Sequence, residues 1–230
     1  MVRIFFLCAR RADLSHAEYA SHLLERHAPL ALRHHARLRG YAVSIVDDAL
    51  DGAEPIDSVN ALTYDSLADF EAQAYDSLAG ERLVTEDHAR FLGGTAGYAT
   101  RAQVQHGAQP AGEPGSASAG TQWLCALRRR ANLSPERFSD SLASALLPDL
   151  LASQPGATRI EISRVERVLF PPGAPDWDAF CGIGFADAAR APAHPFDSPD
   201  CALTVRRRIA ALCGATAVWR VREYVQRRPS

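Results

Sequence analysis

The chain has 230 residues, a formal net charge of −2 at pH 7 and 47% hydrophobic residues, a composition typical of globular proteins. All 25 of its Lys+Arg residues are arginine, which excludes a lysine Schiff base, a pyridoxal-phosphate lysine and the lysine of a Walker A loop. The nearly neutral charge also argues against a general nucleic-acid-binding protein.

The first half of the chain has the pattern of a β-α-β-β-α-β unit. Ser15, followed three residues later by Glu18, forms a capping-box motif that predicts the start of a helix, and Gly40 closes that helix. In chain order the predicted elements are a strand at 2–9, a helix at 15–38, strands at 41–46 and 59–64, a helix at 67–83 and a strand at 95–104.

The second half follows the same order of elements. The predicted elements are a strand at 122–127, a helix at 134–152, strands at 158–170 and 179–185, a helical region that ends near Leu212, and a strand at 216–225. Pro192, Pro195 and Pro199 interrupt the second helical region, because proline breaks the helical hydrogen-bond ladder.

A segment without hydrophobic periodicity separates the halves. Residues 105–120 read QHGAQPAGEPGSASAG, a composition that predicts a flexible linker. We therefore expect an N-terminal domain at 1–104 and a C-terminal domain at 121–230.

The two halves repeat each other. RRADLS at 10–15 recurs as RRANLS at 129–134, and YDS at 75–77 recurs as FDS at 196–198. So long a period indicates a duplicated domain, because solenoid repeats span only about 20–50 residues. Each unit predicts a four-stranded antiparallel sheet with two helices on one face, the ferredoxin-like arrangement. The fold class is therefore α+β, and the two bare sheet faces are expected to bury each other in an intramolecular barrel.

Location follows from the absence of targeting signals. The sequence has no apolar run of the roughly 18 residues that a membrane span requires, and its short apolar start is more typical of a strand than of a signal peptide. The five cysteines, an odd number with no C-x-x-C spacing, are Cys8, Cys125, Cys181, Cys201 and Cys213. No disulfide framework is predicted, so the expected location is the cytoplasm.

Several motifs of the first half occur together at a spacing typical of one family. HAPL at 27–30 lies in the capped helix, and LRGY at 38–41 opens the next strand. DSL at 65–67 opens the second helix, and Asp87 and Phe91 precede the last strand. In these residues the first half resembles the EthD family of the dimeric α+β-barrel superfamily.

The resemblance implies a fold and a range of functions. EthD proteins are small and pair as homodimers, so this chain looks like such a dimer fused into one polypeptide. Family members often accompany ether or aromatic catabolism, and the superfamily includes isomerases, monooxygenases and decarboxylases. The chain departs from the family pattern at Leu23, where an aromatic residue is expected, and at Ala61 and Thr63, where an acidic residue and an aromatic one are expected.

His27 is the predicted catalytic residue. Tyr19, Leu23 and His27 share one stripe of the first helix, and this stripe should face the sheet. The repeat places Leu146 at the position of His27, so the fold itself does not need a polar group there. A buried histidine has a lowered pKa and is a usable general base near pH 7. The alternative interpretation is a hydrogen-bonded core histidine.

The predicted ligand-binding residues surround His27. They are Tyr19 and Leu23 on the helix and Tyr41, Tyr64 and Tyr98 on the strands. No metal site is predicted, since the histidines lack the spacing of paired zinc ligands. No cofactor is expected either, because G-x-G-x-x-G is absent.

Three functions remain open from the sequence. The first is a cofactor-free enzyme, an isomerase, decarboxylase or related lyase, that acts on a small hydrophobic or aromatic metabolite. The second is a non-catalytic ligand-binding or accessory module of a catabolic pathway, and the third is a purely structural protein. The expected partner is a small molecule, with no nucleic acid or membrane, and the expected assembly is a monomer with an internal pseudo-dimer or a homodimer.

Overall fold

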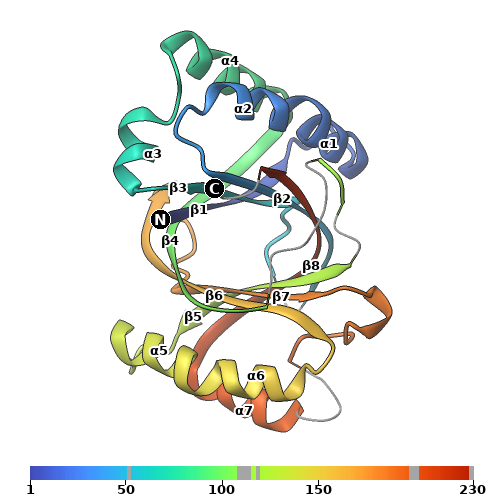
Figure 1. The fold of residues 1–230 in the computed structure, drawn as a ribbon, viewed down its shortest axis with the longest axis vertical. Coiled ribbons are helices and arrows are strands. Elements are labelled where there is room, and N and C mark those ends of the chain that lie inside the picture. Colours follow the sequence, from blue (N-terminus) through green and yellow to red (C-terminus); the bar gives the residue numbers. More distant parts are fainter. Residues whose placement is uncertain (51–52, 108–114, 118–119, 197–201, 228–230) are drawn as a thin grey trace.

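Eight antiparallel strands form one closed barrel that helices cover on two opposite sides (Figure 1). This computed structural model describes residues 1–50, 53–107, 115–117, 120–196 and 202–227. The strands are β1 (Val2–Arg10), β2 (Gly40–Leu50), β3 (Ser58–Tyr64), β4 (Leu92–Gly107), β5 (Thr121–Arg129), β6 (Ala157–Phe170), β7 (Ala179–Phe185) and β8 (Cys213–Arg227). Their order around the barrel is β1-β3-β2-β8-β5-β7-β6-β4.

Two seams join the halves of the chain. The first half supplies adjacent strands in the order β4-β1-β3-β2, and the second half supplies β8-β5-β7-β6 in the same relative order. One seam pairs β2 with β8, and the other pairs β4 with β6. The mixed fold and its antiparallel barrel agree with the expected α+β class. The sheet edges also hydrogen-bond to each other, which satisfies backbone groups that an open edge leaves unpaired.

The seam strands are longer than the sequence pattern predicts. β2 continues past residue 46 to Leu50, and β4 continues past residue 104 to Gly107, so 105–107 form a strand where a linker was predicted. The physical reason is the seam itself, because β6 and β8 supply hydrogen-bond partners for these extensions. Residues 108–114 and 118–119 of the predicted linker lie outside the described residues.

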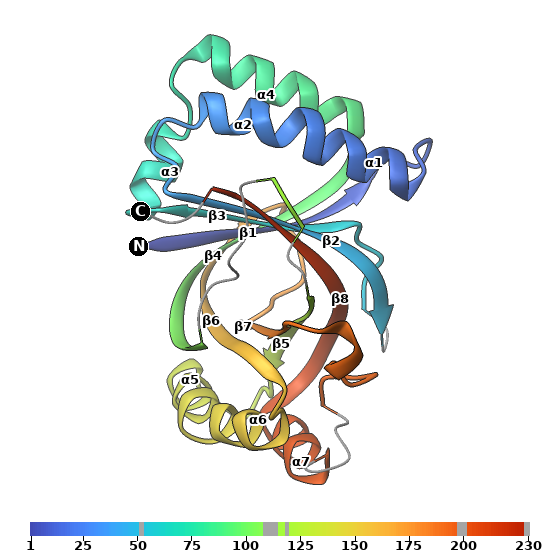
Figure 2. The same cartoon turned by 45° about the vertical axis from the view of Figure 1, so that its right-hand side comes forward.

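The helices divide into one layer for each half of the chain (Figure 2). The first-half layer contains α1 (His16–His22), α2 (Ala28–His34), α3 (Leu67–Gln73) and α4 (Leu78–Phe91). The second-half layer contains α5 (Pro135–Ser141), α6 (Leu147–Ser153) and α7 (Ala202–Leu212), and a short 3₁₀ turn occupies Ala188–Arg190. Within the described ranges, no helix has the length and apolar character needed to cross a lipid bilayer.

The first helix begins at the predicted cap and changes its hydrogen-bond register at a proline. Ser15 Oγ accepts a hydrogen bond from Glu18 N–H at 3.2 Å, and the Glu18 carboxylate accepts one from Ser15 N–H at 2.8 Å. Pro29 has no N–H with which to continue the α-helical ladder. Ala28 N–H instead donates to Leu23 O, five residues back, which is the π-helical pattern.

The predicted helix at 67–83 is two helices. Ser77 is the N-cap at which the second of them, α4, begins, and its side chain accepts a hydrogen bond from Gly80 N–H at 3.0 Å. The first long helix also ends earlier than predicted, at His34 rather than at residue 38. Asp76 N–H donates to His34 O at 2.8 Å, so the break holds α4 against the end of α2.

The two halves share local geometry as well as strand order. The backbone N–H groups of Arg10 and Arg129 donate to Asp57 and Asp178 at 2.8 and 2.9 Å, and each guanidinium pairs with the same carboxylate. A π-helical turn occupies Leu23–His27 in one half and Leu142–Leu146 in the other.

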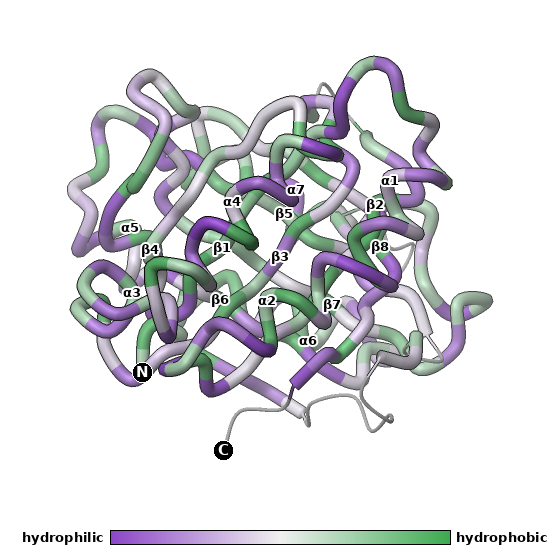
Figure 3. Tube along the Cα trace, turned by 90° about the horizontal axis from the view of Figure 1, so that it is seen from above, coloured by the Kyte–Doolittle hydropathy of each residue, from purple (hydrophilic) through white to green (hydrophobic). Residues whose placement is uncertain are grey.

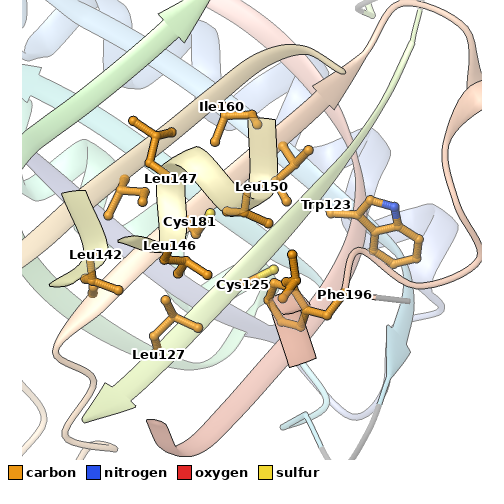
Figure 4. Packing of buried hydrophobic residues seen from close by; sticks show 14 of the residues in the cluster. Trp123, Cys125, Leu127, Leu142, Leu146, Leu147, Leu150, Ile160, Cys181 and Phe196 are labelled. Atoms are coloured by element: carbon orange, nitrogen blue, oxygen red, sulfur yellow. The ribbon is translucent and has the colours of Figure 1, made fainter. Parts of the chain in front are cut away.

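Strand alternation gives the barrel wall two apolar faces. Cys8 of β1 packs beneath the first-half helices, whereas Phe5 and Leu7 pack in the lumen of the barrel. A third cluster fills the space beneath the second-half helices (Figure 4). Figure 3 shows hydrophobic and hydrophilic segments alternating along the chain, as amphipathic elements require. Four of the cysteines, Cys8, Cys125, Cys181 and Cys213, are buried free thiols, and Cys201 lies outside the described residues.

Candidate functional site

A cavity of about 290 Å³ lies between the first-half helices and the sheet. His27, the last residue of the first π turn, lines this cavity and is only 6% exposed. The walls are largely apolar, and six of the lining residues are Phe6, Ala31, Leu62, Phe70, Phe91 and Phe170. Phe170 comes from β6, so the second half of the chain contributes to the cavity.

A carboxylate and two imidazoles form a hydrogen-bonded chain at the cavity wall. His27 Nδ1 lies 2.9 Å from Asp87 Oδ2, and His27 Nε2 lies 3.2 Å from His88 Nε2. Asp87 and His88 are neighbours on α4, whereas His27 precedes α2. The packing of α4 beside α2 therefore creates this chain.

The hydrogen-bond partners fix the tautomers of the two histidines. A carboxylate only accepts hydrogen bonds, so His27 Nδ1 carries a hydrogen and donates to Asp87. Neutral His27 then presents a lone pair at Nε2, which accepts the Nε2–H of His88. In this arrangement the remaining lone pair of His88 is on Nδ1.

Burial keeps both imidazoles neutral at pH 7. Burial lowers the pKa of His27, and the neighbouring Asp87 only partly opposes that effect. Burial, followed by the charge of His27, lowers the pKa of His88 to about 4. Neutral imidazoles in an apolar cavity are available to accept a proton.

Asp87 accepts hydrogen bonds from two histidines. His22 Nε2 lies 3.0 Å from Asp87 Oδ1, on the opposite oxygen from His27. Burial alone would raise the pKa of Asp87, but the hydrogen bonds from His27 and His22 outweigh it and hold the pKa below its usual value. Asp87 is therefore an anion that can stabilise a positive charge on His27.

A second polar group, His35, lines the cavity beyond α2. Tyr64 and His35 share a hydrogen bond of 2.8 Å between the hydroxyl and Nδ1, and the His35 ring lies 4.7 Å from that of Tyr75. Burial, followed by the charge of His88, lowers the pKa of His35 to about 4. His35 thus adds a neutral polar group to an otherwise aromatic wall.

The predicted ligand-binding residues have different positions relative to the cavity. Tyr41 lines it, and Tyr64 is linked to it through His35. Tyr19 and Leu23 are fully buried in the core beneath the helices, where the Tyr19 hydroxyl lies 2.7 Å from Ser58 Oγ. Neither of them is among the residues that line the cavity.

Tyr98 lies on the other side of the sheet from His27. It pairs with Phe5 in the β1–β4 ladder and packs with it in the lumen, where its hydroxyl donates to Pro175 O at 2.9 Å. A strand places alternate side chains on opposite faces, and Tyr98 is on the face that the helices do not cover. Ala61 of β3 also faces the lumen.

The sequence did not predict Asp87, His88 and His35 as residues of the site. All three are buried or half-buried polar residues of the first-half helical layer. Asp87 and Phe91 already belonged to the motif set of the family resemblance, and His88 is adjacent to Asp87. The missing information was the packing of α4 against α2.

In the second half, an apolar side chain occupies the position that corresponds to His27. Leu146 ends the second π turn and is fully buried with Leu142, Leu150 and Cys181 (Figure 4). The polar chain is therefore restricted to one half of the barrel. In the described part of the chain, no group of three or more His, Cys, Asp or Glu side chains has an arrangement that could hold a metal ion.

Comparison with known proteins finds a family match in the first half. Residues 11–95 match the EthD domain, and no curated protein matches the chain significantly. The fold is similar to an anthrone oxidase-like protein (12% identity, 98% and 93% of the two chains covered, TM-score 0.64) and to a candidate monooxygenase from Lactobacillus acidophilus (10% identity, 98% and 96% covered, TM-score 0.57). It is also similar to a mutant chlorite dismutase from Candidatus Nitrospira defluvii (11% identity, 96% and 91% covered, TM-score 0.50). Residues 11–95 therefore resemble an EthD domain, and the whole chain shares its barrel fold with these solved structures.

Proposed function

We propose that this protein binds a small aromatic or apolar metabolite in the cavity beside His27 and catalyses a proton transfer on it without a cofactor. The observation that carries the proposal is the hydrogen-bonded chain of Asp87, His27 and His88 at the wall of an apolar cavity. Such a site supports isomerisation, decarboxylation or a related step that needs an acidic C–H bond to be broken or formed.

The hydrogen-bonded chain of Asp87, His27 and His88 can carry a proton away from the substrate and return it. A substrate C–H bond breaks, and its proton goes to Nδ1 of His88 while the electron pair stays on the substrate. The Nε2 proton of His88 passes to Nε2 of His27, which becomes an imidazolium paired with Asp87. The reverse transfer to another substrate atom completes an isomerisation. Asp87 acts by orienting and stabilising the imidazolium, as a carboxylate does in catalytic triads.

The size of the cavity limits the substrate. Its volume of about 290 Å³ is just below the range of about 300–1,000 Å³ for small-molecule sites. Phe6, Phe70 and Phe91 offer aromatic faces, and His35 adds a polar group. One small ring with a carbonyl or phenol oxygen fits this lining.

We also propose that the units 1–104 and 121–230 are two ferredoxin-like repeats. They would pair within one chain as two subunits pair in the homodimers for which the superfamily is named. Matching strand order, matching π turns and the matching Arg10–Asp57 and Arg129–Asp178 pairs support this duplication. The His27 site belongs to the first repeat, and the second repeat serves as its structural partner.

Deuterium exchange tests the chemistry with 2-coumaranone, a small aromatic lactone with an acidic C–H bond. We expect the protein to accelerate exchange of this hydrogen with D₂O, measured by proton NMR. His88→Gln and Asp87→Asn should each slow the exchange by about 100-fold or more, the usual contribution of a general base. His106→Gln is the matched control, because His106 is exposed at the end of β4.

A non-catalytic ligand-binding module is the second candidate, favoured by the same apolar cavity. It predicts that 2-coumaranone binds without exchange above the rate in buffer. Exchange that is unchanged by His88→Gln would contradict the proton-transfer chain itself.

A further inference from the structure

A second cavity, of about 230 Å³, lies inside the barrel at the end where β1 begins and β8 ends. Its apolar floor contains Phe5 and Phe180, whose rings stack with centroids 5.0 Å apart. Because side chains alternate along a strand, this cavity lies on the opposite face of the barrel wall from His27. Tyr41, near the start of β2, lines both cavities. This second cavity is therefore a separate space from the site described above.

A buried ionic cluster forms the polar wall of this cavity. Glu161 accepts hydrogen bonds from Arg3 and, at 2.8 Å, from Arg159, and Glu223 lies 3.4 Å from the same Arg159 guanidinium. The side chains of Arg159, Glu161 and Glu223 are all less than 10% exposed. Burial would raise the pKa of Glu161, but Arg3 and Arg159 hold it below its usual value. Glu161 is thus held as an anion between two guanidinium groups.

A buried ionic cluster of this kind generally contributes little net stability. Buried ion pairs can often be replaced by hydrophobic residues of similar volume with no loss of stability, and the neighbouring part of the lumen is packed with hydrocarbon. The cluster also leaves hydrogen-bonding capacity unused, because Arg159 Nε has no partner among the residues that the structure describes. A buried guanidinium N–H favours an anionic acceptor.

The charges at the cavity do not cancel. Three arginines line it, Arg3, Arg159 and Arg227, against two glutamates, Glu161 and Glu223, and no other charged residue of the described ranges lines it. This excess positive charge lies beside an apolar floor. The combination favours a ligand with one negative charge and a small apolar body.

We propose that the barrel lumen is a second binding site, for a small aromatic monocarboxylate. The carboxylate is neutralised by the positive charges of Arg159 and Arg227, which both line the cavity. The ring of the ligand packs on Phe5 and Phe180. The site is independent of the proton-transfer chemistry at His27, since it lies on the other face of the wall.

Benzoate is the probe, and its neutral analogue benzamide is the matched ligand. Calorimetry should detect benzoate binding, and benzamide should bind about tenfold or more weakly, because it loses the charge-assisted hydrogen bonds. NMR contacts between benzoate and the rings of Phe5 and Phe180 would locate it. Binding that does not distinguish the two probes, or no benzoate binding at millimolar concentration, would overturn the proposal.

Two cavity-filling variants separate the two sites. Ala61→Leu fills the lumen cavity and should abolish benzoate binding, whereas Ala31→Leu fills the cavity beside His27 and should leave it unchanged. Loss of benzoate binding in Ala31→Leu alone would assign benzoate to the His27 cavity and refute the lumen site. If Ala61→Leu does not fold, Arg227→Glu serves in its place. Arg227 is exposed, and its reversal gives the lining an excess negative charge, so unchanged binding there would also refute the site.

Discussion

Burial of neutral histidines in the first half couples the stability of the protein to pH. His35 and His88 have pKa values of about 4 in the folded chain, against about 6.5 in an unfolded one. Between these values the unfolded chain binds protons that the folded chain does not, so acidification favours unfolding. We expect the free energy of unfolding to fall from pH 6.5 toward pH 4 by about 1.4 kcal/mol per pH unit for each histidine.

Urea unfolding at a series of pH values measures this slope. His88→Gln removes one of the titrating groups and should reduce the slope by the contribution of one histidine. His106→Gln, at an exposed position, should leave it unchanged. A slope in His88→Gln equal to that of the wild-type protein would show that His88 is not neutral in the folded state.

Residue identity predicts only part of the site. His27 could be selected because its helix stripe is apolar and Leu146 occupies the matching position of the second half. Its partners could not, because Asp87 and His88 meet it only when α4 packs against α2, and no periodicity in the sequence encodes that docking. The core and functional interpretations of His27 are compatible, since the hydrogen bond to Asp87 satisfies a buried imidazole and, in the proposed mechanism, also orients it.

At the scale of elements, a proline in each half sets the register of a helix. Pro29 and Pro148 both follow a π turn, and that turn ends at His27 in one half and at Leu146 in the other. Pro29→Ala supplies the missing N–H and allows the turn to close as an α-helix. The resulting rotation should separate His27 from Asp87 and slow the exchange of 2-coumaranone by about 100-fold, as misplacement by about 1 Å can.

The second half provides the internal control for this change. Pro148→Ala makes the same backbone change beside Leu146, so it should change thermal stability to a similar extent and leave exchange unaffected. Exchange rates that respond equally to both substitutions, or to neither, would mean that the π turn does not position His27.

At the scale of the whole molecule, the two seams should hold the halves together without a covalent link. Lumen residues from both halves pack in one cluster, which includes Phe5 and Tyr98 from the first and Phe180 and Trp219 from the second. A protease site inserted after Gly112 should therefore yield two fragments that co-elute in size-exclusion chromatography. Fragments that separate in dilute native buffer would contradict a barrel stabilised by its seams.

The sequence predicts the individual elements of the barrel better than its closure. Helix N-cap residues and strand alternation are local signals, and they locate most strands and helices to within a few residues. The seam extensions are missed because Asp47 and Asp48 are typical of a turn when considered alone. In the barrel they pair with β8, where Asp47 lies 2.7 Å from Arg222 and Asp48 lies 3.6 Å from Arg220. Only the long-range pairing makes these residues compatible with a strand.

The β2–β8 seam has a consequence for synthesis on the ribosome. β2 is complete by Leu50, but β8 ends at Arg227, so at roughly 5–20 residues per second the edge of β2 waits about 10–35 s for its neighbour. An unpaired edge can add strands from other nascent chains. Asp47 and Asp48 carry the same charge on every copy, and this repulsion protects the waiting edge until Arg222 and Arg220 arrive to neutralise it.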